Sequence, residues 1–273
     1  MTTTIYGSVY DHPKLYDVLF SIEWKREIEF LNSCFRHYGI GPVRRLFEPA
    51  CGTGRLLWRL GKQGFDVSGL DLNPHSVAFC NRRLRKHGLS ETAIVGDMTD
   101  FHLQRPVDAA FNLVSSFLYL TTEESAKEHL RCVAAALRPK GLYLLGFHLI
   151  PQGPASCSQE SWSTARGALA LQSKLRSASR DAAKRLETIE FRIQATTPTK
   201  SYELIDTFPM RTYTASQFRR LLTDVALFDV LETFDFKMDH PIRVDGGTED
   251  VVFVLQTKSP NYSPALPEER RKP

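Results

Sequence analysis

Short apolar segments alternate with helical patterns through residues 45–147, and this alternation constrains the fold more than any other feature of the chain. The apolar segments are residues 45–48, 65–70, 92–95, 109–114 and 141–147. Strands that alternate with helices form βαβ units, which build a parallel sheet covered by helices. The sequence therefore predicts an α/β core in this part of the chain.

The pattern changes to a period of two between residues 150 and 211. Ile189, Phe191 and Ile193 alternate with polar residues, as in strands that bury only one face. A helix is the competing interpretation for residues 165–186, which are rich in Ala, Lys and Arg. We expect antiparallel strands at residues 168–179, 185–196 and 201–210.

The segments after residue 211 complete the pattern. Thr214 and Gln217 match a capping box that opens a helix reaching about residue 226. Residues 230–236 and 251–256 are typical of two further strands. The end of the chain is rich in proline and charge, which predicts a flexible tail.

Composition limits the kinds of partner. With 42% hydrophobic and 24% charged residues, the 273-residue chain has the make-up of a globular protein. Its net charge of +4 is small for this length and gives little reason to expect nucleic acid as a partner. The five cysteines are odd in number and widely spaced, so we expect neither a disulfide framework nor a metal site. The chain begins without a signal-peptide pattern and has no long apolar run, so we expect a cytoplasmic protein with no membrane contact.

The first apolar segment leads into a turn that contains two glycines. Residues 46–56 read LFEPACGTGRL, so that Glu48 ends the strand and Gly52 and Gly54 precede a helix. Glycine in such a turn lets the backbone approach a bound nucleotide closely. Asp71 ends the next strand about 20 residues on, where an acid accepts hydrogen bonds from ribose hydroxyls. Together these residues predict a site for a nucleoside-containing cofactor.

Two classes of cofactor compete for this site. A dinucleotide fingerprint needs a third small residue at position 57, where this chain has Leu57. Asp97 and Met98 follow the third strand, where an Asp can bond an adenine amino group and a Met can cover the ring. The Asp97 side chain can instead cap a turn. The pattern favours S-adenosylmethionine over a nicotinamide dinucleotide.

These motifs, in this order, resemble those of the class I S-adenosylmethionine-dependent methyltransferases. Four segments carry the resemblance: residues 47–54 (FEPACGTG), Asp71, residues 96–98 (GDM), and residues 137–141 (LRPKG) before the fifth strand. The resemblance implies an α/β, Rossmann-like seven-stranded sheet of order 3-2-1-4-5-7-6, with an antiparallel β-strand insertion between strand 5 and the following helix. Ala50 departs from the family's first glycine, and we expect alanine to hold this turn at negative φ.

The resemblance also divides the chain into segments. The insertion is expected to be either a lid over the active site or the contact surface of a homodimer. The implied segments are an N-terminal helical lid at residues 1–40, a methyltransferase domain at residues 41–149 and 212–257, the antiparallel insertion at residues 150–211, and the flexible tail at residues 258–273.

The resemblance implies that S-adenosylmethionine binds at the carboxyl edge of the sheet and leaves as S-adenosylhomocysteine. Aromatic residues of the N-terminal segment are implied to close over it. The implied cofactor residues are Tyr16, Trp24, Glu48, Ala50, Gly52, Gly54, Asp71, Leu72, Asp97, Met98 and Leu113.

Within the family, the insertion and residues 107–120 resemble those of small-molecule methyltransferases such as glycine and sugar N-methyltransferases. The signature of the DNA amino-methyltransferases is absent after the fourth strand, where residues 112–115 read NLVS. The expected acceptor is a nitrogen or an oxygen of a small molecule. His148 is the candidate general base, because strand ends face the ligand in open α/β sheets and histidine titrates near neutral pH. The candidate substrate residues are Tyr10, Ser116, Arg211 and Tyr213.

Other functions stay open at this point. A noncatalytic S-adenosylmethionine-binding module that regulates a partner would carry the same cofactor motifs. A nicotinamide-dependent oxidoreductase is disfavoured by Leu57. Methylation of RNA or protein would need a basic groove that forms only in three dimensions.

Overall fold

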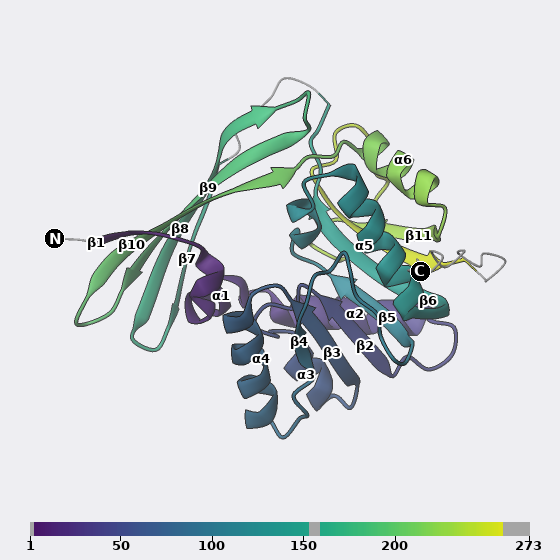
Figure 1. Ribbon diagram of the computed structural model, residues 1–273, viewed down its shortest axis with the longest axis horizontal. Coiled ribbons are helices and arrows are strands. Elements are labelled where there is room, and N and C mark those ends of the chain that lie inside the picture. The colour runs from purple at the N-terminus through teal and green to yellow at the C-terminus, as the bar shows by residue number, and fades with distance from the viewer. Residues whose placement is uncertain (1–2, 153–158, 259–273) are drawn as a thin grey trace, which may run out of the picture.

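The computed structural model of the protein describes residues 3–152 and 159–258. It contains two sheets, a seven-stranded one and a five-stranded one, which lie side by side in Figure 1. None of the helices in these ranges has both the length and the apolar character that crossing a membrane requires.

The seven-stranded sheet forms the centre of the fold. Its order is β11-β12-β6-β5-β2-β3-β4, which is the predicted order 3-2-1-4-5-7-6 read from the other edge. β12 runs antiparallel to both of its neighbours, β6 and β11. The strands are β2 (Arg45–Pro49), β3 (Asp66–Asp71), β4 (Ala93–Val95), β5 (Val107–Asn112), β6 (Leu137–His148), β11 (Phe228–Phe234) and β12 (Asp250–Thr257).

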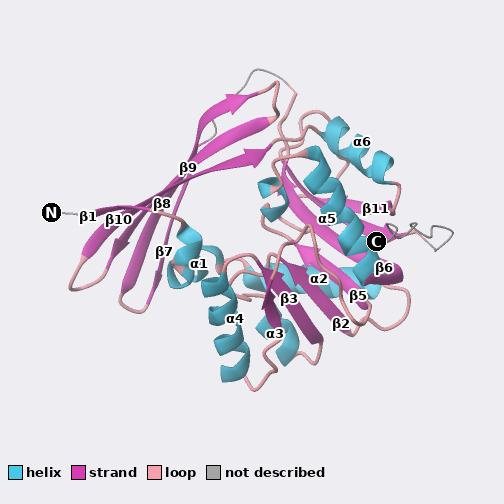
Figure 2. Ribbon diagram, in the orientation of Figure 1, coloured by secondary structure: helices cyan, strands magenta, loops and turns pink. Residues whose placement is uncertain are grey.

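Helices cover both faces of this sheet, which is why its strands are apolar on both sides (Figure 2). Leu144 of β6 packs in the core beneath α2, α3 and α4, whereas its neighbour Leu145 packs in the core beneath α5 and α6. The helices are α1 (Pro13–Phe20), α2 (Trp24–Tyr38), α3 (Leu57–Lys62), α4 (Pro74–Lys86), α5 (Glu123–Ala136) and α6 (Ala215–Val225), with two short 3-10 helices, η1 (Val9–Asp11) and η2 (Ser116–Tyr119).

The helix ends follow the signals in the sequence. The side chain of Asn73 accepts hydrogen bonds from two backbone N–H groups at the start of α4, and Pro74 opens that helix. Thr214 and Gln217 form the predicted capping box of α6. The Asn73 cap places the amino end of α4 directly after β3, at the carboxyl edge of the seven-stranded sheet.

The insertion forms the second sheet, and the strand interpretation of residues 165–186 is confirmed. Its order is β1-β10-β9-β8-β7, with antiparallel pairing from β7 to β10. The sequence pattern predicted β8, β9 and β10 but missed two strands: β1, which pairs in parallel with β10, and β7 at the opposite edge. The strands are β1 (Thr3–Tyr6), β7 (Gln159–Arg166), β8 (Leu169–Asp181), β9 (Leu186–Thr196) and β10 (Ser201–Arg211).

Helix α1 joins the two sheets, as Figure 1 shows. Val18 and Leu19 of α1 pack against the apolar face of the insertion sheet, where Phe191 and Ile193 are buried. The same helix contacts α4 of the central domain. The N-terminal segment therefore combines a strand with helices, where the sequence predicted a helical lid alone.

One predicted turn differs in the structure. Residues 137–141 belong to β6, which begins at Leu137 directly after α5. Lys140 has a φ of +61°, and the pairing with β5 shifts register between Val107 and Ala109. A local turn within a continuous strand thus replaces the predicted separate turn. The predicted tail lies outside the described residues, apart from residue 258.

Candidate functional site

The turn between β2 and α3 contains residues with positive φ, a left-handed backbone conformation that favours glycine. Gly52 and Gly54 have φ values of +52° and +64°. A Cβ on Gly54 would overlap the Sγ atom of Cys80 in α4, so this position requires glycine for space as well as for φ. The expectation for Ala50 is wrong: its φ is +55°, because the bends on either side of it, rather than its own Cβ, set the path of the turn.

Asp71 holds this turn at the carboxyl end of β3. Its Oδ2 atom accepts a hydrogen bond from the backbone N–H of Gly52 at 2.8 Å, and its Oδ1 atom accepts one from that of Asn73 at 2.9 Å. Burial raises the pKa of Asp71 above its usual value. A carboxylate has about four acceptor positions, so both oxygens retain capacity for a ligand's hydroxyl groups.

Two buried acceptor atoms near the turn have no hydrogen-bond partner among the described residues: Oε2 of Glu48, at the end of β2, and Oδ1 of Asn112, at the end of β5. The amide nitrogen of Asn112 donates to the carbonyl of Pro49 at 2.9 Å, which fixes this side chain beside β2. Burial raises the pKa of Glu48 well above its usual value, and Arg55 opposes this only in part. Arg55 is itself bound in two places by Glu27. An unsatisfied buried acceptor is costly, so both atoms suit a ligand that supplies N–H or ammonium donors.

Aromatic rings from the N-terminal segment cover the turn. A Cβ on Gly52 would lie 3.4 Å from Cε1 of Tyr16, so the Tyr16 ring rests on this glycine. The hydroxyl of Tyr10 donates to that of Tyr119 in η2 at 2.7 Å, and the ring of Tyr119 lies 5.1 Å from that of Phe208 in β10. The N-terminal segment, the loop after β5 and the insertion therefore meet beside the glycine turn.

Asp17 of α1 anchors this cover to the central domain. It is buried, and its Oδ1 atom accepts hydrogen bonds from the hydroxyl of Thr53 at 3.1 Å and from Arg83 at 2.7 Å. Arg166, at the end of β7, binds its other oxygen. Burial alone would raise the pKa of Asp17, but Arg83 and Arg166 hold it at about 2. A single carboxylate thus ties α1, the glycine turn, α4 and the insertion together.

The predicted adenine residues lie at the carboxyl ends of β3 and β4. Leu72 exposes 73% of its surface directly after Asp71, although it is a large apolar residue. The Oδ1 atom of Asp97 accepts hydrogen bonds from the N–H and the hydroxyl of Thr99. The Asp97 side chain therefore caps a turn, as the alternative interpretation of the sequence expected. Met98 is half-buried and packs against the core on the α5 side. Its backbone carbonyl oxygen lies 2.9 Å from Nδ1 of His129.

Leu113 and Ser116 lie in the loop that follows β5. Leu113 is buried, and its backbone packs so closely on Gly146 of β6 that a Cβ on Gly146 would lie 2.8 Å from the Leu113 carbonyl oxygen. Ser116 opens η2 and is half-buried, with its Oγ atom 3.5 Å from the carbonyl of Val114. Both residues are thus at the sheet edge that carries the glycine turn.

Trp24 and His148 have contacts away from the glycine turn. The ring of Trp24, at the start of α2, carries the guanidinium of Arg59 at 4.2 Å. His148 ends β6, where its Nδ1 atom lies 2.5 Å from Oδ1 of Asp250 and its ring packs on Phe236. These partners come from β12 and from the loop after β11, so the His148 side chain contacts the side of β6 opposite to β5.

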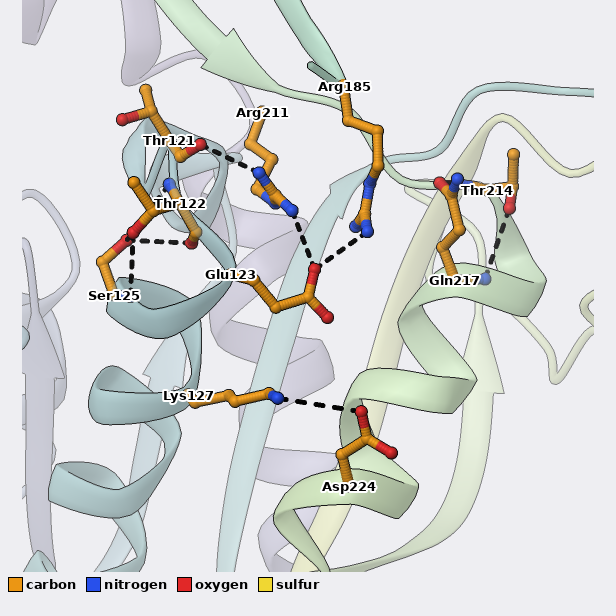
Figure 3. A network of polar contacts seen from close by, with 10 residues as sticks. All are labelled: Thr121, Thr122, Glu123, Ser125, Lys127, Arg185, Arg211, Thr214, Gln217 and Asp224. Carbon is orange, nitrogen blue, oxygen red and sulfur yellow. Dashed lines mark hydrogen bonds and ion pairs between the residues drawn. The ribbon is translucent and has the colours of Figure 1, made fainter. Parts of the chain in front are cut away.

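Arg211 belongs to a polar network at the base of the insertion (Figure 3). Its guanidinium donates to the carbonyl of Thr121 at 2.9 Å and to Oε2 of Glu123 at 2.7 Å. Arg185, from the turn between β8 and β9, binds the same oxygen at 2.8 Å. Tyr213 is fully buried beneath the two arginines. The structure therefore gives Arg211, a candidate substrate residue, an acid of α5 as its partner.

Three residues at this site were missed by the sequence analysis: Asn112, Tyr119 and Asp17. Asn112 had a usable signal, because it is a polar residue at the carboxyl end of a strand, directly after three apolar residues. Tyr119 lies in the loop after that strand, a position that commonly faces a ligand. Asp17 has no signal in the sequence, since its role depends on partners that lie 36, 66 and 149 residues away.

The donor and acceptor set fits S-adenosylmethionine. The two unpartnered acceptors, on Glu48 and Asn112, suit its ammonium group, and Asp71 suits its ribose hydroxyls. The exposed Leu72 side chain offers an apolar surface to its adenine ring.

Comparisons with known proteins agree with this geometry. Residues 47–141 match the family model described as a methyltransferase domain. One curated relative, a dTDP-3-amino-3,4,6-trideoxy-alpha-D-glucopyranose N,N-dimethyltransferase of Streptomyces venezuelae, is 33% identical over 37% of this chain and 40% of its own length. Another, a dTDP-4-amino-2,3,4,6-tetradeoxy-D-glucose N,N-dimethyltransferase of Saccharopolyspora spinosa, is 26% identical over 53% of this chain and 56% of its own length. The chain thus matches about half the length of these relatives.

Solved structures resemble the whole fold. An S-adenosylmethionine-dependent methyltransferase from Clostridium acetobutylicum has a TM-score of 0.74 at 14% identity, covering 91% of this chain and 98% of its own. The sugar N-methyltransferase KedS8 from Streptoalloteichus has a TM-score of 0.70 at 20% identity, covering 95% of this chain and 98% of its own. In this chain β12 is antiparallel and the sheet has seven strands, whereas the dinucleotide-binding fold has the order 3-2-1-4-5-6. The chain therefore contains a methyltransferase domain at residues 47–141, and its fold resembles that of solved S-adenosylmethionine-dependent methyltransferases.

Proposed function

We propose that this protein transfers a methyl group from S-adenosylmethionine to the amino nitrogen of a small molecule such as an amino sugar. The observation that carries the proposal is the contact between Tyr10 and Tyr119, which closes the N-terminal segment over the loop after β5 beside the glycine turn. Two relatives that act on amino sugars, by their names, are 33% and 26% identical to this chain over 37% and 53% of its length.

The residues around this contact favour a nitrogen acceptor over an oxygen acceptor. Burial raises the pKa values of Tyr10, Tyr16 and Tyr119, so the three phenols stay neutral at physiological pH. Neutral phenols position an amine by hydrogen bonding and by the faces of their rings, but they are weak bases. A hydroxyl acceptor would gain more from a strong base than an amine, which can lose its proton to water before it attacks.

When bound, the cofactor supplies a methyl group on a positively charged sulfur, which is already an activated electrophile. The chain's own contribution is therefore to hold the amine in line with the carbon–sulfur bond and to exclude water. The amine nitrogen forms the new bond to the methyl carbon, the carbon–sulfur electron pair stays on sulfur, and the amine releases a proton. Tyr10 and Tyr119 orient the amine, and Glu48, Asp71 and Asn112 hold the cofactor.

His148, the base predicted from the sequence, is the proposed acceptor of the released proton, although its protein contacts lie on the side of β6 opposite to β5. Burial lowers its pKa, but the contact with Asp250 outweighs this and leaves the pKa raised. Asp250 holds Nδ1, so Nε2 is the nitrogen that takes the proton. Replacing His148 with Gln should lower kcat and remove the fall in rate at low pH, where the imidazole is protonated, without changing affinity for S-adenosylhomocysteine. An unchanged pH profile would remove His148 from the mechanism.

The decisive experiment incubates the full chain with S-adenosylmethionine and a panel of amino sugars, their nucleotide-linked forms and the matching hydroxy sugars. Mass spectrometry should find methyl groups on the amines alone. Asp71→Ala should lose transfer together with S-adenosylhomocysteine binding, whereas Asp239→Ala, at an exposed position, should retain both. Transfer to hydroxyls would overturn the choice of nitrogen. Cofactor binding with no transfer to any amine would favour the noncatalytic module.

The arginine network at the base of the insertion is assigned a structural role, because protein groups already bind Arg211. The domain boundaries, the homodimer and the cytoplasmic location stay predictions.

A further inference from the structure

A second site lies on the helical layer, apart from the glycine turn. A pocket of about 540 Å³ opens between α1, α2, α3 and α4, with the end of β7 at its rim. Five basic side chains line it, and Asp17 supplies the one carboxylate in its lining. The basic residues are Arg59, Arg82, Arg83, Lys86 and Arg166.

Positive charge in this pocket is only partly neutralised. Arg83 and Arg166 both pair with Asp17. Within the described residues, Arg59, Arg82 and Lys86 have no carboxylate at ion-pair distance. Like charges gathered at a partly enclosed site are unfavourable, and an anion relieves that cost.

Arg59 is the clearest sign that the site suits an anion. Its guanidinium lies between the rings of Trp58 and Trp24, 4.3 and 4.2 Å from their centroids, and donates to the carbonyl of Arg55. Its Nε atom is buried and has no hydrogen-bond partner within the part of the chain that the structure describes. Burial and the neighbouring Arg83 lower its pKa to about 10, as expected where positive charge is uncompensated.

The aromatic rings of the pocket are already occupied. Trp58 stacks on His87 at 4.0 Å on one side and on Arg59 on the other. Phe79 carries the guanidinium of Arg83 at 4.9 Å. These rings hold cations in place instead of presenting a face to a planar ligand, so the chemistry of the site is that of a charged group and not of a ring.

We propose that this pocket binds a small anion with two adjacent phosphate groups, of the diphosphate class. The five cations come from α3, α4 and β7, and two phosphate groups offer them more acceptor oxygens and more negative charge than one phosphate does. Guanidinium groups suit phosphate because they bind it through two parallel hydrogen bonds. The anion can be free diphosphate or the diphosphate part of a nucleotide, which share this chemistry.

Occupation of the pocket weakens cofactor binding through Asp17. This carboxylate shares Arg83 and Arg166 with the pocket, and it also accepts a hydrogen bond from Thr53 in the glycine turn. An anion that draws the two arginines toward itself loosens α1 over the turn. Such coupling is reciprocal, so each ligand lowers the affinity for the other by the same factor.

The test titrates inorganic diphosphate into the full chain by calorimetry at constant ionic strength. The double variant Arg82→Gln/Lys86→Gln removes two exposed pocket cations, and Lys62→Gln/Arg85→Gln removes the same charge from α3 and α4 outside the pocket. The proposal expects at least roughly tenfold weaker binding in the first variant and a change within about twofold in the second. Equal losses in both variants, or no binding by the unmodified protein at millimolar diphosphate, would overturn it.

Two further titrations complete the design. A nucleoside diphosphate that binds no tighter than inorganic diphosphate assigns the site to the free anion, and one that binds more tightly assigns it to a nucleotide. Saturating diphosphate should raise the Kd for S-adenosylhomocysteine, and this effect should vanish in Arg82→Gln/Lys86→Gln. An unchanged Kd in the presence of bound diphosphate would refute the coupling through Asp17. Direct diphosphate binding is measured without methyl transfer, so its outcome is independent of the proposed reaction.

Discussion

The hydroxyl groups of Tyr10 and Tyr119 lie 2.7 Å apart, although 109 residues separate them in the chain. The contact joins η1 of the N-terminal segment to η2 of the loop after β5. Tyr16 and Phe208 pack on either side of the pair, so it is enclosed by rings from three segments. This hydrogen bond within an aromatic cluster therefore helps to hold the cover over the glycine turn, together with the contacts of Asp17.

Removing this hydrogen bond should loosen the cover. Tyr119→Phe keeps the ring but leaves the Tyr10 hydroxyl without its partner, at a cost of about 1 kcal/mol. We expect S-adenosylhomocysteine to bind about fivefold more weakly, as measured by calorimetry. Tyr6→Phe is the control, because Tyr6 is 79% exposed on β1. Equal affinity in both variants would show that the pair does not contribute to cofactor binding.

We expect the Glu48 side chain to destabilise the folded protein and to contribute to cofactor binding. Its pKa is raised by burial, so the folded state holds this proton more tightly than the unfolded state. Stability then falls as pH rises from the unfolded pKa through the folded one. Glu48→Gln should remove this fall and unfold at higher urea near neutral pH, while binding S-adenosylhomocysteine about tenfold more weakly through loss of a charge-assisted hydrogen bond. If the stability of the unmodified protein and that of Glu48→Gln changed with pH in parallel, the pKa of Glu48 would not be raised. Glu29→Gln, at an exposed position, is the control.

Ala50 should be strained by its positive φ. The left-handed region costs an L-residue roughly 1–2 kcal/mol, whereas glycine costs about 0.5–1 kcal/mol in extra unfolded-state freedom. Ala50→Gly should therefore raise the free energy of unfolding by about 0.5 kcal/mol. The same change at Ala135, exposed in α5, should lower it by about 1 kcal/mol. Denaturant titration measures the free energy of unfolding of both variants. If Ala50→Gly lost stability as Ala135→Gly does, Ala50 would not be strained.

Glu123 should hold the insertion on the central domain. Arg185 and Arg211 both bind its Oε2 atom. Burial alone would raise the pKa of Glu123, but the two arginines outweigh this effect and lower it. Glu123→Gln should lower the free energy of unfolding by about 2 kcal/mol, the scale of hydrogen bonds to charged groups. The neighbouring Lys127–Asp224 pair, at 3.8 Å and more exposed, is the matched control. Asp224→Asn should change the free energy of unfolding by less than about 0.5 kcal/mol. If both variants lost the same stability, Glu123 would not be what holds the insertion on the central domain.

The sequence by itself determined the central sheet and the cofactor edge. Glu48 and Asp71 end two parallel strands, and parallel strands place their carboxyl ends along one edge whatever the loops between them do. The capping residues Asn73 and Thr214 fix their helices through neighbours within three residues. Features of this kind depend on local backbone geometry and on the period of the apolar residues, both of which can be read along the chain.

Only the tertiary structure decided which side chains meet. Asp17 contacts Thr53, Arg83 and Arg166 because α1 is packed between α4 and the insertion sheet, and no local pattern encodes that packing. The φ of Ala50 follows from the path between β2 and α3 and not from alanine's own preference. Contacts between distant residues depend on how whole elements pack and on the closure of the loops between them, so they appear only when the fold is complete.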